Sequence, residues 1–499
     1  MTQETTTLPD NVPSTSTGDS RWLALFVLCA GMLMIILDQT IVNVALPYIQ
    51  RDLGFSQSNL AWVVNAYLVA FGGLLLLAGR LGDLIGRKRV FMVGLVVFTA
   101  ASLWCGVSGS QEMLIAARFV QGAGGAMASA VILGMVVTMF PEPRERAKAI
   151  GVYTFVASGG ASIGLLAGGI LTQALNWHWI FYVNVPIGIA AALLAGRLLG
   201  TDHGIGLREG ADAAGAVLVT AALMLGVYTI VKSADYGWGS AHTLGLGTVA
   251  IALLVAFVVR QARAAKPLLP LGIFRSRNVS GANLIQMLTV AGGLGMFFSG
   301  ALYMQLVLGY NALQIGLAFL PVAVAIGTLS LGFSARLITR FGARPVLLVG
   351  LTLVLAGLSL FTRAPVDAGY VVDLLPTMLL LGIGFGAAFP SLMTLVMSDA
   401  TDSDAGLASG LANTTMQVGG ALGLATLAAL ATSRTDRLIA EGVSTAWALT
   451  GGYHLAFGLG VAFVAAAIVL GVTVLRPRAE EHPQVERAEQ PEVASEYLG

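Results

Sequence analysis

The chain has 499 residues, of which 56% are hydrophobic and only 11% are charged, and its formal net charge is +1. This composition lies outside the range of soluble globular domains, and apolar stretches of roughly 20 residues recur along the whole chain. It predicts an all-α integral membrane protein. Cys29 and Cys105 both lie within apolar stretches, so the sequence indicates neither a disulfide framework nor a metal or other cofactor, and it suggests no nucleic-acid partner.

Uncharged stretches, aromatic flanks and turn signals predict fourteen membrane-spanning helices. The first six are expected near 22–48, 60–79, 88–106, 112–138, 147–173 and 179–199. Two more follow near 211–231 and 243–261. The last six are expected near 279–307, 313–335, 345–362, 370–397, 405–431 and 450–475.

This order of helices predicts two six-helix bundles with two additional helices between them. We expect a disordered cytoplasmic tail at 1–21, an N-terminal bundle at 22–199, a two-helix hairpin with a cytoplasmic loop at 200–278, a C-terminal bundle at 279–475, and a second disordered tail at 476–499. Residues in the first tail are polar and lack the basic start of a cleavable signal peptide.

An internal repeat supports the division into two halves. The segment AGRLGDLIGRKRVFMVGL, at 78–95, returns 256 residues later as SARLITRFGARPVLLVGL, with seven of eighteen positions identical. Each copy is expected to be a short basic hairpin between two spanning helices, and Gly86 supplies the backbone freedom of its turn. Two related six-helix halves are typical of transporters with parallel repeats, whose substrate site lies near the membrane midplane between the halves.

The distribution of basic residues predicts the orientation of the chain. In the fourteen-helix arrangement twenty-one Lys and Arg side chains lie on one side of the membrane and five on the other, while Arg118 remains within the membrane. Loops rich in Lys and Arg stay in the cytoplasm. Both termini are therefore predicted to be cytoplasmic.

Two charged residues are expected deep in the membrane. Asp38 lies well inside the first span, and intramembrane acids often carry protons or face a partner. Arg118 on the fourth span lies at a similar depth, and Gln121 shares its helix face. We expect Asp38 and Arg118 to couple transport to protons. The alternatives for Asp38 are a permanent ion pair or a hydrogen-bonded structural acid. Those for Arg118 are substrate binding or an outward-snorkelling side chain.

The remaining polar residues within spans are predicted to line a substrate cavity. These candidates are Asn43, Gln121, Gln286, Tyr303, Gln305, Asn413 and Gln417. Asn43 is turned about 140° from Asp38 around the first helix, so the two are not expected to share a face. Glycines at every fourth position of the fifth span, Gly160, Gly164 and Gly168, predict a close approach of another helix.

Together these segments resemble the fourteen-helix drug/proton antiporters of the major facilitator superfamily, the EmrB/QacA type, along residues 22–475. The stretches that carry the resemblance are LDQTIVNVALP, GRLGDLIGRKRV, ARFVQGAGGA and NWHWIFYVNVPIG. The resemblance implies that Asp38 is the coupling acid and that Arg118 takes part in proton coupling. It also implies an inner gate formed by the loop motif, with Gly79, Asp83, Gly86, Arg87 and Lys88.

The sequence departs from this family at three positions. Leu165 follows Gly164 where the fifth-helix motif has proline, so the kink of that helix is in doubt. His178 stands where a basic arginine is usual, and Thr339 replaces Asp83 in the second copy of the loop motif.

The resulting expectation is a multi-pass proton-coupled exporter in a bacterial plasma membrane. It would act as a monomer, driven by a proton gradient, on small amphipathic or cationic compounds. The alternatives are a transporter of a native metabolite or lipid, and a membrane sensor that binds its ligand without moving it. The nucleotide-binding pattern GxxxxGK[ST] is absent from the sequence, which argues against a pump driven by nucleotide hydrolysis.

Overall fold

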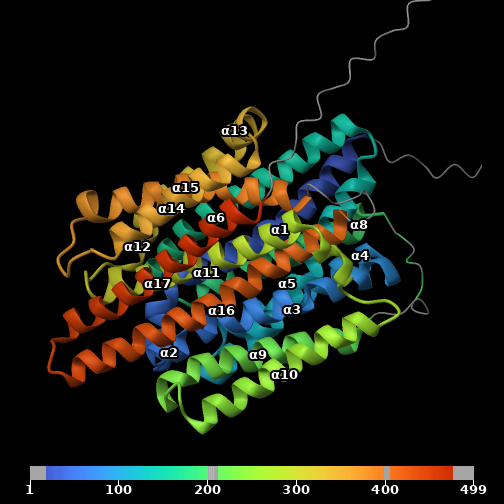
Figure 1. Cartoon of the computed structure of the whole chain (residues 1–499). Coiled ribbons are helices and arrows are strands. Elements are labelled where there is room, and N and C mark those ends of the chain that lie inside the picture. The colour runs from blue at the N-terminus through green and yellow to red at the C-terminus, as the bar shows by residue number, and fades with distance from the viewer. Residues whose placement is uncertain are drawn as a thin grey trace, which may run out of the picture.

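The computed structural model describes residues 18–200, 202, 204, 206, 212–397 and 405–475, and these form long helices that run side by side (Figure 1). Twelve helices among the described residues are long and apolar enough to cross a membrane. Two further apolar helical stretches are shorter: Ile163–Ala174, which is the last part of a longer helix, and Ala312–Thr328. The predicted tails lie mostly outside the described residues. Residues 18–21 already belong to the first helix, because its hydrogen-bonded backbone continues beyond the apolar stretch that hydropathy detects.

The helices follow the predicted order. The N-terminal half contains α1 (Gly18–Leu53), α2 (Gln57–Leu60), α3 (Trp62–Ile85), α4 (Arg87–Gly106), α5 (Gln111–Met139), α6 (Pro143–Ala174), α7 (Trp179–Tyr182) and α8 (Asn184–Leu198). The intervening hairpin contains α9 (Ala213–Tyr236) and α10 (Ala241–Arg263). The C-terminal half contains η2 (Leu271–Arg275), α11 (Arg277–Leu306), α12 (Ala312–Thr328), η3 (Leu329–Phe333), α13 (Ser334–Phe341), α14 (Ala343–Phe361), η4 (Tyr370–Leu374), α15 (Leu375–Met397), α16 (Ala405–Ala440) and α17 (Thr445–Thr473).

The two copies of the repeated segment form matching turns. Gly86 between α3 and α4 has φ 100°, and Gly342 between α13 and α14 has φ 84°, a region that only glycine enters without strain. Each turn is followed by a basic side chain that binds the carboxyl end of a distant helix. Lys88 Nζ donates to Gly196 O and Leu199 O at the end of α8, and Arg344 donates to Gly471 O and Val472 O at the end of α17.

The inserted hairpin packs at the side of the bundle, where α9 contacts α3 and α16 (Figure 1). Asp212 holds its base by accepting hydrogen bonds from Gly215 N, Arg260 Nε and Gln261 Nε2. Burial raises the pKa of Asp212, but these hydrogen bonds outweigh it, so the pKa lies below its ordinary value. This network therefore stays ionised at neutral and mildly acidic pH.

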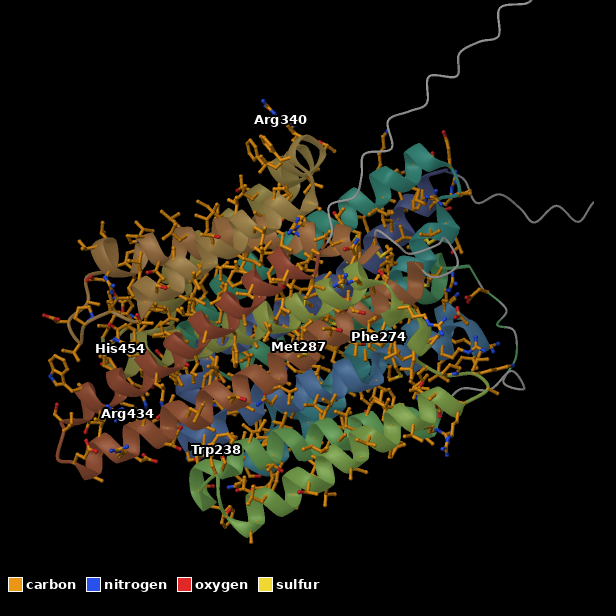
Figure 2. All side chains as sticks on the ribbon, in the orientation of Figure 1. Trp238, Phe274, Met287, Arg340, Arg434 and His454 are labelled. Carbon is orange, nitrogen blue, oxygen red and sulfur yellow. The ribbon has the colours of Figure 1, made fainter. Side chains whose placement is uncertain are left out.

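The halves meet along α6 and α12 and along α3 and α16. At the end predicted to be extracellular, Ala312 N donates to the Tyr48 hydroxyl at 2.8 Å, and Gln57 Nε2 donates to the Tyr453 hydroxyl at 2.7 Å. Figure 2 places Trp238, Arg434 and His454 toward this end of the bundle and Phe274 toward the opposite end. We refer to the Tyr48–Ala312 and Gln57–Tyr453 contacts as the outer latch.

Candidate functional site

A buried ion pair lies at the centre of the N-terminal half. Arg118 Nη1 on α5 donates to Asp38 Oδ2 on α1 at 2.5 Å, and the side chains are 1% and 0% exposed. Asp38 lies in the middle of α1, while Arg118 lies in the second turn of α5, which begins where Ser110 accepts a hydrogen bond from Met113 N. The contact expected from their similar depths is therefore present. A buried charge left without its partner costs about 3–5 kcal/mol, so neither residue can be removed cheaply.

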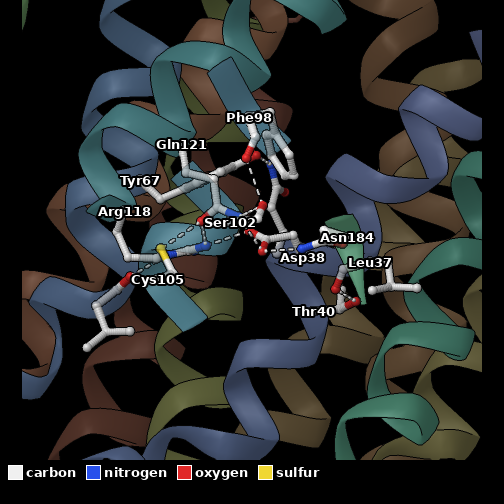
Figure 3. A network of polar contacts seen from close by, with 12 residues as sticks. Leu37, Asp38, Thr40, Tyr67, Phe98, Ser102, Cys105, Arg118, Gln121 and Asn184 are labelled. Carbon is white, nitrogen blue, oxygen red and sulfur yellow. Dashed lines mark hydrogen bonds and ion pairs between the residues drawn. The ribbon is translucent and has the colours of Figure 1, made fainter. Parts of the chain in front are cut away.

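Neutral amides complete the hydrogen bonding around this pair. Gln121 Nε2 donates to Asp38 Oδ1 at 2.8 Å, and Asn184 Nδ2 donates to the same oxygen at 3.0 Å. Gln121 also accepts from Arg118 Nη1 and donates to Ser102 Oγ on α4. Figure 3 shows Arg118 and Gln121 on one side of the Asp38 carboxylate and Asn184 on the other. The carboxylate is thus held by three helices, α1, α5 and α8.

Arg118 is fixed by two further contacts. Its Nε donates to Val63 O on α3 at 2.9 Å, and its guanidinium carbon lies 4.5 Å from the centre of the Tyr67 ring. Such stacking of a cation on an aromatic face is favourable in a dry environment. The arginine therefore points inward and does not snorkel to the surface.

A largely apolar cavity lies between the two halves, next to Arg118. Its empty space, including the part open to solvent, is about 750 Å³, a size that suits a small-molecule ligand. Seven helices from both halves supply its lining: Gln39, Val64, Tyr67, Leu68, Arg118, Val290, Gly293, Leu294, Phe297, Ile326, Phe385, Phe389, Met416 and Gln417.

Most of the polar residues predicted to line a cavity lie elsewhere in this conformation. Gln417 is a lining residue, whereas Gln121 faces Asp38 and the Asn43 amide donates back to Gln39 O and Thr40 O of its own helix. Tyr303 donates to Pro365 O in the connection between α14 and η4. The others that do not line this cavity are Gln286, Gln305 and Asn413. Buried polar groups are satisfied by whatever partner is near, so polarity alone does not locate a cavity.

The three spaced glycines of α6 face α1. A Cβ added at Gly160 would contact Leu33, one at Gly164 would overlap Thr40, and one at Gly168 would lie 2.7 Å from Ile41 O. α6 is a continuous helix through Leu165, the position at which the family motif has proline. The backbone of Leu165 instead lies close to Gly316 of α12, in the other half.

The residues of the loop motif make separate contacts, whereas the resemblance implies a single inner gate. Asp83 is exposed and lies 3.4 Å from Arg87 on the next turn, a surface pair that contributes little stability. Arg87 Nη1 also donates to Gly134 O of α5, while Lys88 binds the end of α8. A Cβ at Gly79 would meet no atom within 4 Å. The motif therefore ties α4 to α5 and α8 in this conformation.

Several residues of the site carried no signal in the sequence. Asn184, Ser102 and Tyr67 belong to the buried network, but neutral polar side chains are common in membrane helices and do not mark a site alone. Asp202 was also missed. It accepts hydrogen bonds from the backbone N–H groups of Arg87 and Lys88 and so caps α4 from a distant loop. Among the residues that the structure describes, no three His, Cys, Asp or Glu side chains are grouped as metal ligands.

Comparison with known proteins places this chain in a family. The family model described as Major Facilitator Superfamily matches residues 28–424. The puromycin resistance protein of Streptomyces alboniger is 39% identical over 90% of both chains. The cephamycin export protein of Amycolatopsis lactamdurans is 38% identical over 93% of both chains. The tetracenomycin C resistance and export protein of Streptomyces glaucescens is 34% identical, over 87% of this chain and 81% of that one.

Solved structures agree with the fold. A peptide transporter of the POT family superimposes with a TM-score of 0.66 at 14% identity, covering 93% of this chain and 99% of the other. A bacterial homologue of the human lysosomal transporter Spinster gives a TM-score of 0.65 at 15% identity, covering 93% and 100%. The match over most of the chain, the long relatives and the two-half helical fold lead to one conclusion: this multi-span membrane protein belongs to the Major Facilitator Superfamily, as a relative of its antibiotic resistance and export proteins.

Proposed function

We propose that this chain is a proton-coupled exporter of small amphipathic compounds that works by alternating access. The observation that carries the proposal is the buried Asp38–Arg118 pair directly beside an apolar cavity built from both halves. Relatives at 34–39% identity that are named for antibiotic resistance or export support drug efflux as the activity. The cavity supplies the substrate site, and Asp38 supplies the proton site.

The hydrogen bonds around Asp38 suggest how the proton acts. In the ionised state the negative charge of Asp38 compensates the positive charge of Arg118. Protonation of Asp38 removes the negative charge and weakens the pair. A protonated carboxyl also needs an acceptor, and Asn184 carries an Oδ1 with no hydrogen-bond donor among the described residues. Proton binding that changes these contacts differently in the two conformations shifts the equilibrium between them.

The same proposal includes fourteen membrane crossings with both termini in the cytoplasm. The two crossings beyond these twelve would be the fifth, by α6, whose 32 residues include the apolar stretch Ile163–Ala174, and the tenth, by α12 with 17 residues. α12 continues through η3 into α13, which lengthens the path it can span. A single chain contains both halves and the cavity between them, so a monomer suffices for the transport cycle.

Transport in reconstituted vesicles tests the proposal. A panel of toxic amphipathic compounds, chosen by the protection that expression gives to sensitive cells, is loaded and its movement is followed under an imposed pH gradient. We expect the wild type to concentrate at least one compound against its gradient. Asp38→Asn carries no titrating group at this position, so it should abolish uphill movement while downhill exchange continues.

The matched control is Asp235→Asn, which changes an acid that pairs with Lys232 at the surface. It should transport as the wild type does. Uphill transport that survives in Asp38→Asn would refute the coupling role. A wild type that moves no compound of the panel, with or without a gradient, would refute transport itself.

A further inference from the structure

The cavity between the halves has an unusual charge balance for a site expected to accept cations. Arg118 is the one charged side chain among its lining residues, and no Asp or Glu side chain belongs to that lining. Asp38 lies behind Arg118, and its two oxygens accept hydrogen bonds from Arg118, Gln121 and Asn184. The pair as a whole is neutral, but of its two members only Arg118 belongs to the cavity lining.

The contacts of Arg118 leave one nitrogen, with two N–H groups, for a ligand. Its Nη1 donates to Asp38 and Gln121, and its Nε donates to Val63 O. Its Nη2 has no hydrogen-bond acceptor in the part of the chain that the structure describes. Arg118 belongs to the cavity lining, so N–H groups of Nη2 that bind no protein oxygen are available to an acceptor oxygen of a ligand.

The aromatic lining favours a flat ligand. The rings of Phe385 and Phe389 are parallel within 10° and their centres are 5.4 Å apart, and Phe297 lies in the same lining. The face of Tyr67 already carries the Arg118 guanidinium. The remaining polar contacts come from the neutral amides of Gln39 and Gln417.

A cationic ligand would meet three penalties in this site. It would lose its water, it would approach a fixed positive charge, and it would find no carboxylate to compensate it. Cation–π contacts with the phenylalanine rings offset only part of this cost. A neutral aromatic ligand with a carbonyl or phenol oxygen loses much less hydration free energy, avoids the other two penalties and offers Arg118 an acceptor.

We propose that the cavity selects uncharged, flat aromatic compounds that carry an acceptor oxygen, and that it discriminates against permanent cations. This narrows the substrate of the transport cycle proposed above and replaces the expectation of cationic substrates that came from the family resemblance. Binding can be measured without transport, so the charge preference and the proposed function are tested separately.

Equilibrium dialysis of the full chain in lipid nanodiscs tests the preference with two three-ring probes. Acridone is neutral and carries a ring carbonyl, and N-methylacridinium is a permanent cation of similar size. We expect acridone to bind at least about tenfold more tightly, the order of a moderate like-charge repulsion in a low-dielectric site. Empty nanodiscs correct for partition into lipid.

A pair of variants at one position supplies the control. Gln417→Glu places a carboxylate in the lining and should raise the affinity for N-methylacridinium relative to Gln417→Met, which is similar in size and neutral. Gln417→Met serves only as the neutral reference of similar size, because Gln417 itself belongs to the lining and its loss changes the site for both probes.

Equal binding of the two probes by the wild type, tighter binding of the cation, or no detectable binding of acridone overturns the proposal. So does a cation affinity in Gln417→Glu no higher than in Gln417→Met. If the wild type prefers acridone but transports nothing in vesicles, the charge preference stands and the exporter proposal fails. If the wild type exports cations in preference to neutral compounds under a pH gradient, the exporter proposal stands and the charge preference fails.

Discussion

Asn184 lies at the start of α8, directly after the aromatic stretch WHWIFYV, and its side chain reaches Asp38 from the side opposite Arg118. The sequence marks this stretch as an interface between membrane and water, so an asparagine there reads as one more interfacial polar residue. Its role follows only from the packing of α1 against α8. Asn184 is thus a positioning residue for the proposed proton site.

Replacing Asn184 by leucine tests this role. Leucine is similar in size but offers neither the Nδ2 donor that the ionised carboxylate accepts from nor the Oδ1 acceptor proposed for the protonated carboxyl. We expect proton-driven export to fall by about tenfold, the order of one lost hydrogen bond to a charged group, while downhill exchange continues.

Asn43→Leu is the matched control. Asn43 lies on the same helix as Asp38, but its amide donates to backbone oxygens and does not touch the carboxylate. This variant should change the amount of folded protein more than proton-driven export per folded molecule. Export at the wild-type level in Asn184→Leu would reduce Asn184 to a packing residue.

At the residue scale the sequence identified the charged members of the site. Asp38 and Arg118 stand out because a charge within the membrane is costly and needs a reason, and Gln121 follows from its spacing. The cavity lining could not be identified in the same way. Phe385, Phe389 and Leu294 have the side chains that any membrane helix uses for packing, and only the meeting of the two halves shows which of them face a cavity.

The outer latch joins the two halves at the end predicted to be extracellular. In the latch, Tyr48 satisfies the free backbone N–H at the start of α12, and Tyr453 accepts from Gln57. Both contacts join the N-terminal half to the C-terminal half. Opening the cavity at this end requires both to break, so they favour the conformation seen here.

Tyr453→Phe removes one contact of the latch while keeping the ring. The loss of one hydrogen bond should raise the ratio of open to closed molecules at this end roughly two- to tenfold. Spin labels at Gly109→Cys in the first half and Trp447→Cys in the second report this as growth of a longer distance by pulsed electron paramagnetic resonance. Both positions are exposed, and the native Cys29 and Cys105 are buried.

Tyr370→Phe provides the comparison. Tyr370 donates to Ala318 O, so the same substitution there removes a hydrogen bond within the C-terminal half and leaves the contact between halves intact. Its distance distribution should match that of the wild type. An unchanged distribution in Tyr453→Phe as well would show that packing of α6 on α12 holds this end without the latch.

At the element scale the helix order was predictable and the helix ends were less so. The predicted gaps between spans, at 173–179 and 307–313, agree within a residue with the ends of α6 at Ala174 and α11 at Leu306. α16 extends to Ala440, well beyond the predicted end near 431, because a helix continues past the apolar stretch as long as its backbone hydrogen bonds are satisfied. The capping of α4 by Asp202 depends on tertiary contact and had no local signal.

The repeat governs the architecture of the whole molecule. Position 88 of the first copy aligns with 344 of the second, and Lys88 and Arg344 bind the ends of the last helix in their respective halves. Gly94 and Gly350 likewise allow close approaches, to α5 and α15. The halves differ where chemistry is concerned, because the buried ion pair occurs only in the first half among the described residues. The scaffold is therefore symmetric, whereas the buried pair proposed for coupling is not.

The orientation of the molecule is tested best across a single helix. Tyr236 ends α9 and is 55% exposed, and Gly272 lies beyond α10 with open space around it, so cysteine fits at both positions. Basic residues gather on the Gly272 side of α10, including Arg260, Arg263 and Lys266, and such clusters stay in the cytoplasm.

A membrane-impermeant maleimide added to intact cells should therefore label Tyr236→Cys and leave Gly272→Cys unlabelled until the cells are permeabilised. The reverse pattern would place both termini outside. Labelling of both positions in intact cells would show that α10 lies against the bundle without crossing the membrane, and the fourteen-helix arrangement would then fail. The two positions that flank α10 thus test orientation and crossing separately. An inverted orientation would reverse the labelling pattern, and a missing crossing would make both positions label alike.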